Sequence, residues 1–289
     1  MKFWQAVTWM EPEQMLEVAR FAEAVGFSGL MLGDHGVFPE TIRTRYPYSA
    51  DGKPPMTPDS YYPDCWASIG AMAAVTTRIR FSVGVYVLPL RNVFEVARAA
   101  GTLSILSADR FIMGVGTGWM KEEFDVYGVD FRTRGKRYDE MITVLRKLWA
   151  GGMVEHHGEL IDFPRLQISP APAQPVPIYM GGAAPVALER TARVADGWIG
   201  AGNVPDEVPR ILATLAEARE RAGRAHLPFE AVFGLSTPPD VDTFLRLEQQ
   251  GMTTGIAYPF KYALGPLSTL DDKKRVMEDF ARRIIEPCR

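Results

Sequence analysis

Segments with the composition of a β-strand alternate with segments that have the periodicity of an amphipathic α-helix along nearly the whole chain. The strand-like segments are residues 3–9, 27–33, 79–88, 110–116, 177–180, 197–201, 229–235 and 253–258. A helical pattern follows each one, most clearly at residues 138–149, where apolar side chains recur at spacings of three and four. Parallel strands joined by right-handed helical crossovers close into a barrel when eight of them are present. We therefore predict an α/β protein, a (β/α)8 TIM barrel formed as a single domain by residues 1–289.

A doubly wound open sheet is the alternative fold for such an alternation. In that fold a glycine-rich turn follows the first strand, whereas no such turn follows residues 3–9 here. The glycines at 114, 116 and 118 also lack the G-x-G-x-x-G spacing of dinucleotide-binding turns. The barrel is therefore the favoured prediction.

Two stretches interrupt the alternation. Residues 36–62 contain five prolines and four tyrosines and show no periodicity. A long irregular loop in a compact barrel is usually functional, so we predict that residues 36–62 form a lid over the site. The second stretch, residues 151–176, is predicted to hold a β-hairpin with strands at 153–156 and 160–163, followed by a proline-rich connection.

Composition and charge indicate which partners to expect. The net charge is −3 and charges of both signs are interspersed, which argues against a nucleic-acid surface. Cys65 and Cys288 are the only cysteines and are far apart in sequence, as in proteins of a reducing cytoplasm. No segment has the character of a signal peptide, and the longest apolar run, residues 81–90, is too short to span a membrane. Adjacent His156 and His157 would point to opposite faces of a strand, so no metal site is predicted. We expect a cytoplasmic protein with a small-molecule substrate.

Two of the predicted strands run directly into glycine-rich turns that precede helices. One turn contains Gly116-Thr117-Gly118 and the other Gly181-Gly182-Ala183. Glycine allows backbone amides to approach a ligand closely, and the N-terminus of a helix favours an anion. The sequence therefore predicts a phosphate-bearing cofactor at the carboxyl ends of the strands.

The motifs around these turns resemble those of the bacterial-luciferase-like superfamily of flavin and deazaflavin oxidoreductases. They appear in family order over residues 1 to about 200. The matching segments are Gly33-Asp34-His35, residues 87–92, residues 114–119, Glu122-Glu123-Phe124 with Gly128, residues 134–140, Gly181-Gly182 and residues 195–198. Within the superfamily the chain is most similar to the branch that uses coenzyme F420, a deazaflavin.

That resemblance implies a cofactor, its site and a reaction. Coenzyme F420 would exchange a hydride at C5 of the deazaflavin with a small organic substrate. The phosphate would lie against Gly181, Gly182 and Ala183, with further cofactor contacts from Gly116, Thr117 and Gly118. The family commonly has a bulge with a non-proline cis peptide at the end of the third strand. Here this bulge, on which the cofactor ring would pack, is expected within Gly84, Val85 and Tyr86.

The resemblance also indicates the residues that act on the substrate. His35 would exchange a proton as the hydride moves, with Asp34 beside it, because an imidazole titrates near neutrality. A structural role for both, in fixing the loop, is the alternative. Trp9, Trp119 and Glu122 are predicted to line the substrate pocket, although aromatic residues near barrel ends are often part of the core.

Three functions remain open from the sequence. The first is an F420-dependent oxidoreductase, and the second is a monooxygenase that uses reduced FMN. The third is a cofactor-binding barrel without turnover. In the resembling F420-dependent glucose-6-phosphate dehydrogenases, glutamate and tryptophan occupy the positions of Trp119 and Pro39, so oxidation of a sugar phosphate is not expected here. Family members often dimerise, and we expect a homodimer or a higher homo-oligomer.

Overall fold

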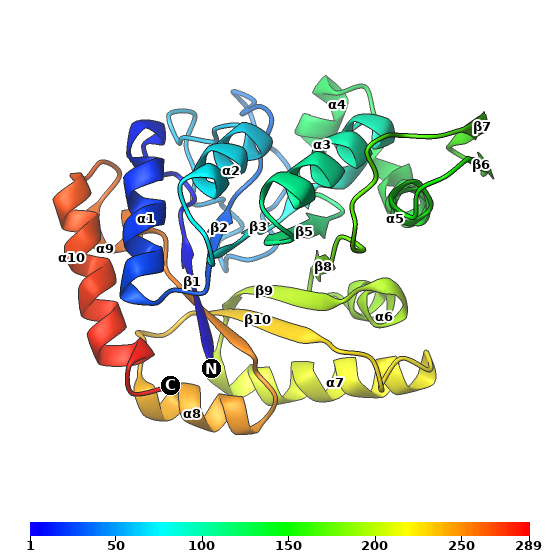
Figure 1. Cartoon of the computed structure of the whole chain (residues 1–289). Coiled ribbons are helices and arrows are strands. Elements are labelled where there is room, and N and C mark those ends of the chain that lie inside the picture. Colours follow the sequence, from blue (N-terminus) through cyan, green and yellow to red (C-terminus); the bar gives the residue numbers. More distant parts are fainter.

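The computed structural model describes all residues from Met1 to Arg289. Parallel strands form a closed barrel with helices around the outside (Figure 1). The strands are β1 (Lys2–Ala6), β2 (Gly29–Leu32), β3 (Arg80–Val83), β4 (Tyr86–Val87), β5 (Phe111–Gly116), β8 (Ile178–Gly181), β9 (Gly197–Asn203), β10 (Glu230–Leu235) and β11 (Thr254–Ala257). Short β3 and β4 occupy one position, and both pair with β5, which closes the ring. The predicted (β/α)8 barrel is confirmed.

Helices follow the strands and cover the outer face of the barrel (Figure 1). They are α1 (Met15–Val25), α2 (Cys65–Ala74), α3 (Val93–Leu106), α4 (Lys121–Val126), α5 (Arg134–Trp149), α6 (Pro185–Val194), α7 (Val208–Arg221), α8 (Val241–Gln249), α9 (Phe260–Leu264) and α10 (Leu270–Phe280). A π-helical turn, Ala281–Ile285, ends the chain's last helix, and short 3-10 turns lie at Pro12–Gln14, Leu88–Leu90, Phe131–Thr133 and Pro205–Glu207. The terminal amine of Met1 donates to the carbonyl of Cys288, so the two ends of the chain meet.

Two apolar cores stabilise the barrel. The larger one lies between the strands and the helices and contains 57 buried residues. The smaller one fills the barrel interior with one or two residues from most strands: Trp4, Ala6, Met31, Ile112, Tyr179, Ile199, Val232 and Ile256. Trp4 and Tyr179 stack with their rings 6.4 Å apart across the interior. The barrel is therefore packed through its middle, as expected for this fold.

The structure differs from the predicted strands at two places near the carboxyl ends. The predicted strand at residues 79–88 is broken into β3 and β4 by a cis peptide bond between Gly84 and Val85. This bond lies where the family resemblance placed it. The predicted strand at residues 3–9 was too long, because β1 ends at Ala6 and Trp9 has a φ of 64°. An alternation of apolar residues cannot show where a strand turns away from its neighbours.

The two insertions have different structures. Residues 36–62 contain no helix or strand. The second insertion contains an antiparallel hairpin of β6 (Val154–His157) and β7 (Asp162–Leu166), one to three residues later in the sequence than predicted. His156 and His157 point to opposite faces there: His156 contacts half-buried Glu140, and His157 contacts exposed Asp162. No helix is long and apolar enough to cross a membrane.

Candidate active site

The carboxyl ends of the strands bring most of the predicted site residues to one end of the barrel. His35 follows β2, the Gly84–Val85 bulge follows β3, and Thr117 follows β5. Gly182 and Ala183 follow β8. We call this end of the barrel the mouth. Because loops from all eight strands meet there, residues distant in sequence can act on one ligand.

The floor of the mouth is built around Val85. Val85 packs on the interior core, while Gly84 beside it is exposed. A β-carbon added at Gly116 would lie 2.4 Å from a methyl group of Val85, and one added at Gly181 would lie 2.8 Å from the other methyl group. Glycine at these two positions therefore makes room for Val85. This packing role was not predicted, and it stands beside the predicted cofactor contacts of both glycines.

The turn between β8 and α6 has the properties of an anion site. The backbone amides of Gly182 and Ala183 donate to no acceptor in the protein. Gly182 has a φ of 113°, and its carbonyl accepts from the indole nitrogen of Trp198 at 2.9 Å, which fixes the turn. α6 begins with Ala184 as its N-cap and no side chain caps it. Exposed free amides at an uncapped helix N-terminus suit a phosphate group. These residues therefore fit a phosphate-bearing cofactor.

His35 lies deeper in the mouth and is held by a buried glutamate. Nδ1 of His35 is 3.0 Å from Oε2 of Glu123, and the other oxygen of Glu123 accepts from the amide of Gly36 at 2.7 Å. Glu123 is only 1% exposed and His35 is 12% exposed. The second ring nitrogen of His35, Nε2, has no hydrogen-bond partner in the protein. The imidazole is therefore fixed on one side and free on the other.

Asp34 points to the opposite side and is fully engaged. Both of its carboxylate oxygens accept from Arg91, at 2.8 and 3.0 Å, and one also accepts from the amide of Val87 at 2.9 Å. Burial raises the pKa of Asp34, while the charge of Arg91 and these hydrogen bonds oppose the increase. Val87 directly follows the floor bulge, so Asp34 ties the end of β2 to the floor.

A continuous series of aromatic contacts lines the side of the mouth formed by the segments after β1, β2, β5 and β11. His35 makes edge contacts with the rings of Tyr62 and Trp119, at 5.2 and 6.0 Å between ring centres. The series continues to Tyr46 and Tyr48 on one side and to Trp9, Tyr262 and Tyr258 on the other. Burial raises the pKa of Tyr46 to about 12, so its phenol is neutral at physiological pH. The predicted pocket residues Trp9 and Trp119 both belong to this series of aromatic rings, which we call the aromatic mouth.

The 36–62 loop is attached to three strand ends. Glu122 accepts from the amides of Arg43 and Thr44 at 2.8 and 3.0 Å, so its carboxylate holds the loop. Lys261, after β11, donates to the carbonyl of Pro55 at 2.8 Å and lies 5.0 Å above the ring of Trp9. These contacts place the loop over the β1, β5 and β11 side of the mouth. Ala201 and Gly202, at the end of β9, remain exposed.

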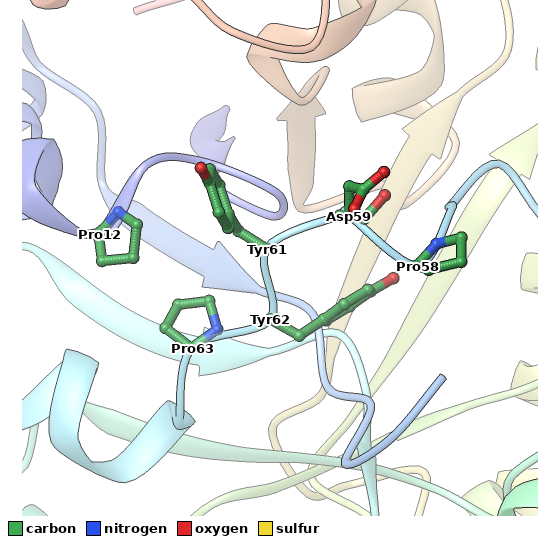
Figure 2. Close-up of a pocket in the computed structure, with 7 residues that line it drawn as sticks. Pro12, Pro58, Asp59, Tyr61, Tyr62 and Pro63 are labelled. Carbon is green, nitrogen blue, oxygen red and sulfur yellow. The ribbon is translucent and has the colours of Figure 1, made fainter. Parts of the chain in front are cut away.

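Two surface hollows lie outside the mouth. The first, of about 450 Å³, lies at the outer edge of the loop and is lined by Pro12, Pro58, Asp59, Ser60, Tyr61, Tyr62 and Pro63. Figure 2 shows the rings of Tyr61 and Tyr62 pointing away from each other at this edge. The second, of about 370 Å³, lies beside α10 and involves none of the predicted site residues. Neither hollow reaches the glycine turns, so the candidate site is defined by free amides and by the chemistry around His35.

Sequence reasoning missed three groups at this site. Glu123, Tyr62 and Arg91 contact His35 or Asp34. Adjacent Glu122 and Glu123 were visible as a pair, but only the structure shows which one faces the histidine. Arg91 was part of a recognised motif without an assigned partner. Nothing in the sequence distinguished Tyr62 from the other tyrosines of the loop.

Comparisons with known proteins give a consistent family. Residues 4–239 match the model of the family described as luciferase-like monooxygenase. An uncharacterized protein of Mycobacterium tuberculosis is 39% identical over 272 residues, covering 93% of this chain and 94% of that protein. An F420-dependent glucose-6-phosphate dehydrogenase of Microbacterium testaceum is 28% identical over 242 residues, covering 81% of this chain and 67% of that protein.

Solved structures share the whole fold. The monooxygenase RslO1 from Streptomyces bottropensis superimposes with a TM-score of 0.77 at 18% identity, over 99% of both chains. An F420-dependent secondary alcohol dehydrogenase, in complex with an F420-acetone adduct, gives a TM-score of 0.76 at 17% identity, over 100% of this chain and 99% of that one. At these identities the likeness establishes the barrel and its connections.

Proposed function

Because the chain belongs to the luciferase-like monooxygenase family, we propose that it is an oxidoreductase that uses coenzyme F420 to oxidise or reduce a small organic substrate. The observation that carries the proposal is the pair of free amides at Gly182 and Ala183, on the same rim as the single free imidazole nitrogen of His35. The relationship to an F420-dependent dehydrogenase supports the choice of cofactor.

The chain offers a place for each part of the cofactor. The amides of Gly182 and Ala183 would hold the phosphate, with Gly181 completing the turn. Gly84, Val85 and Tyr86 would support the ring system from below, and Gly116, Thr117 and Gly118 would flank it. When bound, the deazaflavin supplies a carbon that accepts or donates a hydride. No group of three His, Cys, Asp or Glu side chains is placed to hold a metal ion.

The aromatic mouth indicates the kind of substrate. Its rings provide apolar surface, Glu123 pairs with His35, and Oε1 of Glu122 holds the loop, while Oε2 of Glu122 is buried without a hydrogen-bond partner. An uncharged alcohol or ketone with an apolar body fits this surface better than a sugar phosphate does. His35 would exchange the proton of the substrate oxygen, and Asp34 would position the floor. We further propose that residues 36–62 act as the lid of this site.

A fluorescence titration with F420 and with FMN tests the cofactor. We expect F420 to bind at least tenfold more tightly than FMN. The matched variants are Gly182→Ala and Gly223→Ala, because both glycines have positive φ and only Gly182 lies at the mouth. Backbone strain should destabilise Gly223→Ala by about 1–2 kcal/mol and Gly182→Ala by more, because φ is 113° there and the new β-carbon would lie 3.0 Å from that of Ala187. Only Gly182→Ala should weaken F420 binding. Tight FMN binding without F420 binding would overturn the proposed cofactor.

A monooxygenase that uses reduced FMN is the second candidate, and the family description and the likeness to RslO1 favour it. Such an enzyme must exclude water from a reactive oxygen adduct of the flavin. Oxygen consumption coupled to product formation distinguishes this activity from hydride exchange. An anaerobic assay that yields product at an undiminished rate would exclude it.

A further inference from the structure

We propose that Glu123 is a positioning residue that keeps a proton on Nδ1 of His35 and thereby leaves Nε2 to exchange a proton with the substrate. The inference deepens the proposed function, because it names the proton path at the same site. The geometry that carries it lies within the protein alone: one ring nitrogen is bound to a buried carboxylate, and the other has no partner.

The buried carboxylate of Glu123 requires His35 as a hydrogen-bond donor. It is 1% exposed and forms no ion pair with any lysine or arginine. Its only other hydrogen-bond donor is the backbone amide of Gly36. A buried carboxylate without donors is strongly unfavourable. The side-chain donor that satisfies Glu123 is therefore the Nδ1–H group of His35.

The chemistry of the two groups fixes the position of the proton. An ionised carboxylate can only accept, and a carboxyl group is a stronger acid than an imidazolium ion. The shared proton therefore belongs to Nδ1, and the neutral ring carries its lone pair on Nε2. When Nε2 gains a second proton, the adjacent carboxylate stabilises the imidazolium ion.

Other groups around His35 do not compete for this proton. Tyr62 and Trp119 present ring edges to the imidazole and form no hydrogen bond with it. Asp34, the preceding residue, is paired with Arg91, so its charge is balanced within its own pair. Glu123 is thus the charged group that faces the imidazole directly.

The proposed step balances for an alcohol substrate. The O–H proton passes to Nε2, the C–H bond gives up its two electrons as a hydride to the oxidised deazaflavin, and a C=O bond forms. In the reverse direction the imidazolium returns the proton to the oxygen. Glu123 stays ionised throughout, so it controls the reaction only through the orientation and charge of His35.

Nitrogen-15 NMR of the histidine rings tests the inference without cofactor or substrate. The chain has four histidines, so selective labelling gives four ring systems, and His35→Asn identifies the signals of His35. In the full-length protein above neutral pH, we expect Nδ1 to show the shift of a protonated nitrogen and Nε2 that of an unprotonated one. A ring with its proton on Nε2 would overturn the inference, whatever the variants do.

The adjacent glutamates Glu123 and Glu122 provide the variant and its control. Glu123→Gln keeps an oxygen for the amide of Gly36 and presents an NH2 group to Nδ1, so the ring proton should move to Nε2. Glu122→Gln alters the neighbouring carboxylate, which holds Arg43 and Thr44, and should leave the His35 signals in place. Unchanged His35 signals in Glu123→Gln would contradict the proposed role.

Kinetics connect this state of the ring to turnover. With F420 bound, we expect Glu123→Gln to lower kcat by about 10²- to 10⁴-fold, the usual contribution of a general acid–base group, with KM little changed. If F420 does not bind at all, the proposed function fails while the NMR result still decides the role of Glu123. An unchanged kcat in Glu123→Gln would overturn that role.

Discussion

The two ends of the barrel differ in how their polar groups are used. At the amino ends of the strands, charged side chains find partners within the protein. Glu230 forms ion pairs with both Lys2 and Arg80 at 2.9 Å, and Asp196 accepts a hydrogen bond from the amide of Ile178. At the mouth, the amides of Gly182 and Ala183 have no acceptor. The first arrangement pairs side chains within the protein, although Oε2 of Glu230 is buried without a partner, whereas the second leaves backbone donors that a ligand can satisfy.

Unusual backbone conformations occur at both ends, since Ala108 and Asp109, just before β5, have φ values of 51° and 59°. Trp9, at the end of β1, has a φ of 64°, and its buried indole nitrogen has no hydrogen-bond partner. Unfavourable conformations of this kind persist where the surrounding structure enforces them, commonly at functional sites. The comparison therefore predicts that substitutions away from the mouth, in the barrel interior and at the amino ends of the strands, affect stability. Substitutions at the mouth should affect binding.

Trp4→Ala should have the largest effect on stability. Trp4 is fully buried, stacks on Tyr179 and occupies the space above Gly29, where a β-carbon would lie 2.6 Å from the indole ring. Removing the indole leaves a cavity in the barrel interior, and we expect a loss of about 3–5 kcal/mol in the free energy of unfolding. Urea denaturation measures it. A loss below about 1 kcal/mol would mean that neighbouring side chains of the interior core move to fill the cavity.

Gly116→Ala should have an intermediate effect, because it changes the floor of the mouth. The new β-carbon would overlap a methyl group of Val85, whose branched side chain cannot bend away, and overpacking of this kind costs about 1–3 kcal/mol. The displaced Val85 should also weaken F420 binding. The double variant with Val85→Ala removes the overlap and should be more stable than Gly116→Ala alone. Additive effects in this double-mutant cycle would disprove the packing role.

The sequence was sufficient to predict the alternating strands and helices that repeat along the chain. The bounds predicted for the strands at residues 110–116 and 229–235 match β5 and β10 to within one residue, because their apolar runs are encoded locally. The barrel followed from the number of such units. The cis peptide at Gly84–Val85 followed from resemblance and not from any local pattern.

Contacts between distant segments could not be predicted in the same way. His35 and Glu123 are 88 positions apart, and their pairing depends on how the loops after β2 and β5 fold over the mouth. Likewise, Gly116 and Gly181 share Val85 as a neighbour only because β4, β5 and β8 are adjacent in the barrel. Glycine in a turn suggested ligand binding, but no pattern in the sequence indicated that these glycines also accommodate a side chain.

The smallest effect on stability is expected from the titration of Glu230, at the amino ends of the strands. Burial raises the pKa of Glu230, but hydrogen bonding to Lys2 and the charge of Arg80 lower it further, so the folded-state pKa lies below its ordinary value near 4.5. A group with a lowered pKa stabilises the fold above its unfolded-state pKa, and this stabilisation is lost as the pH falls through the folded-state value. Stability should therefore decrease below about pH 4.5, and Glu230→Gln should remove about 1 kcal/mol or less of that dependence.

Thermal unfolding between pH 3 and pH 7 measures this pH dependence. F420 affinity at neutral pH should not change in Glu230→Gln, since Glu230 lies at the opposite end of the barrel from the mouth. A loss of affinity there would show that the two ends of the barrel are coupled.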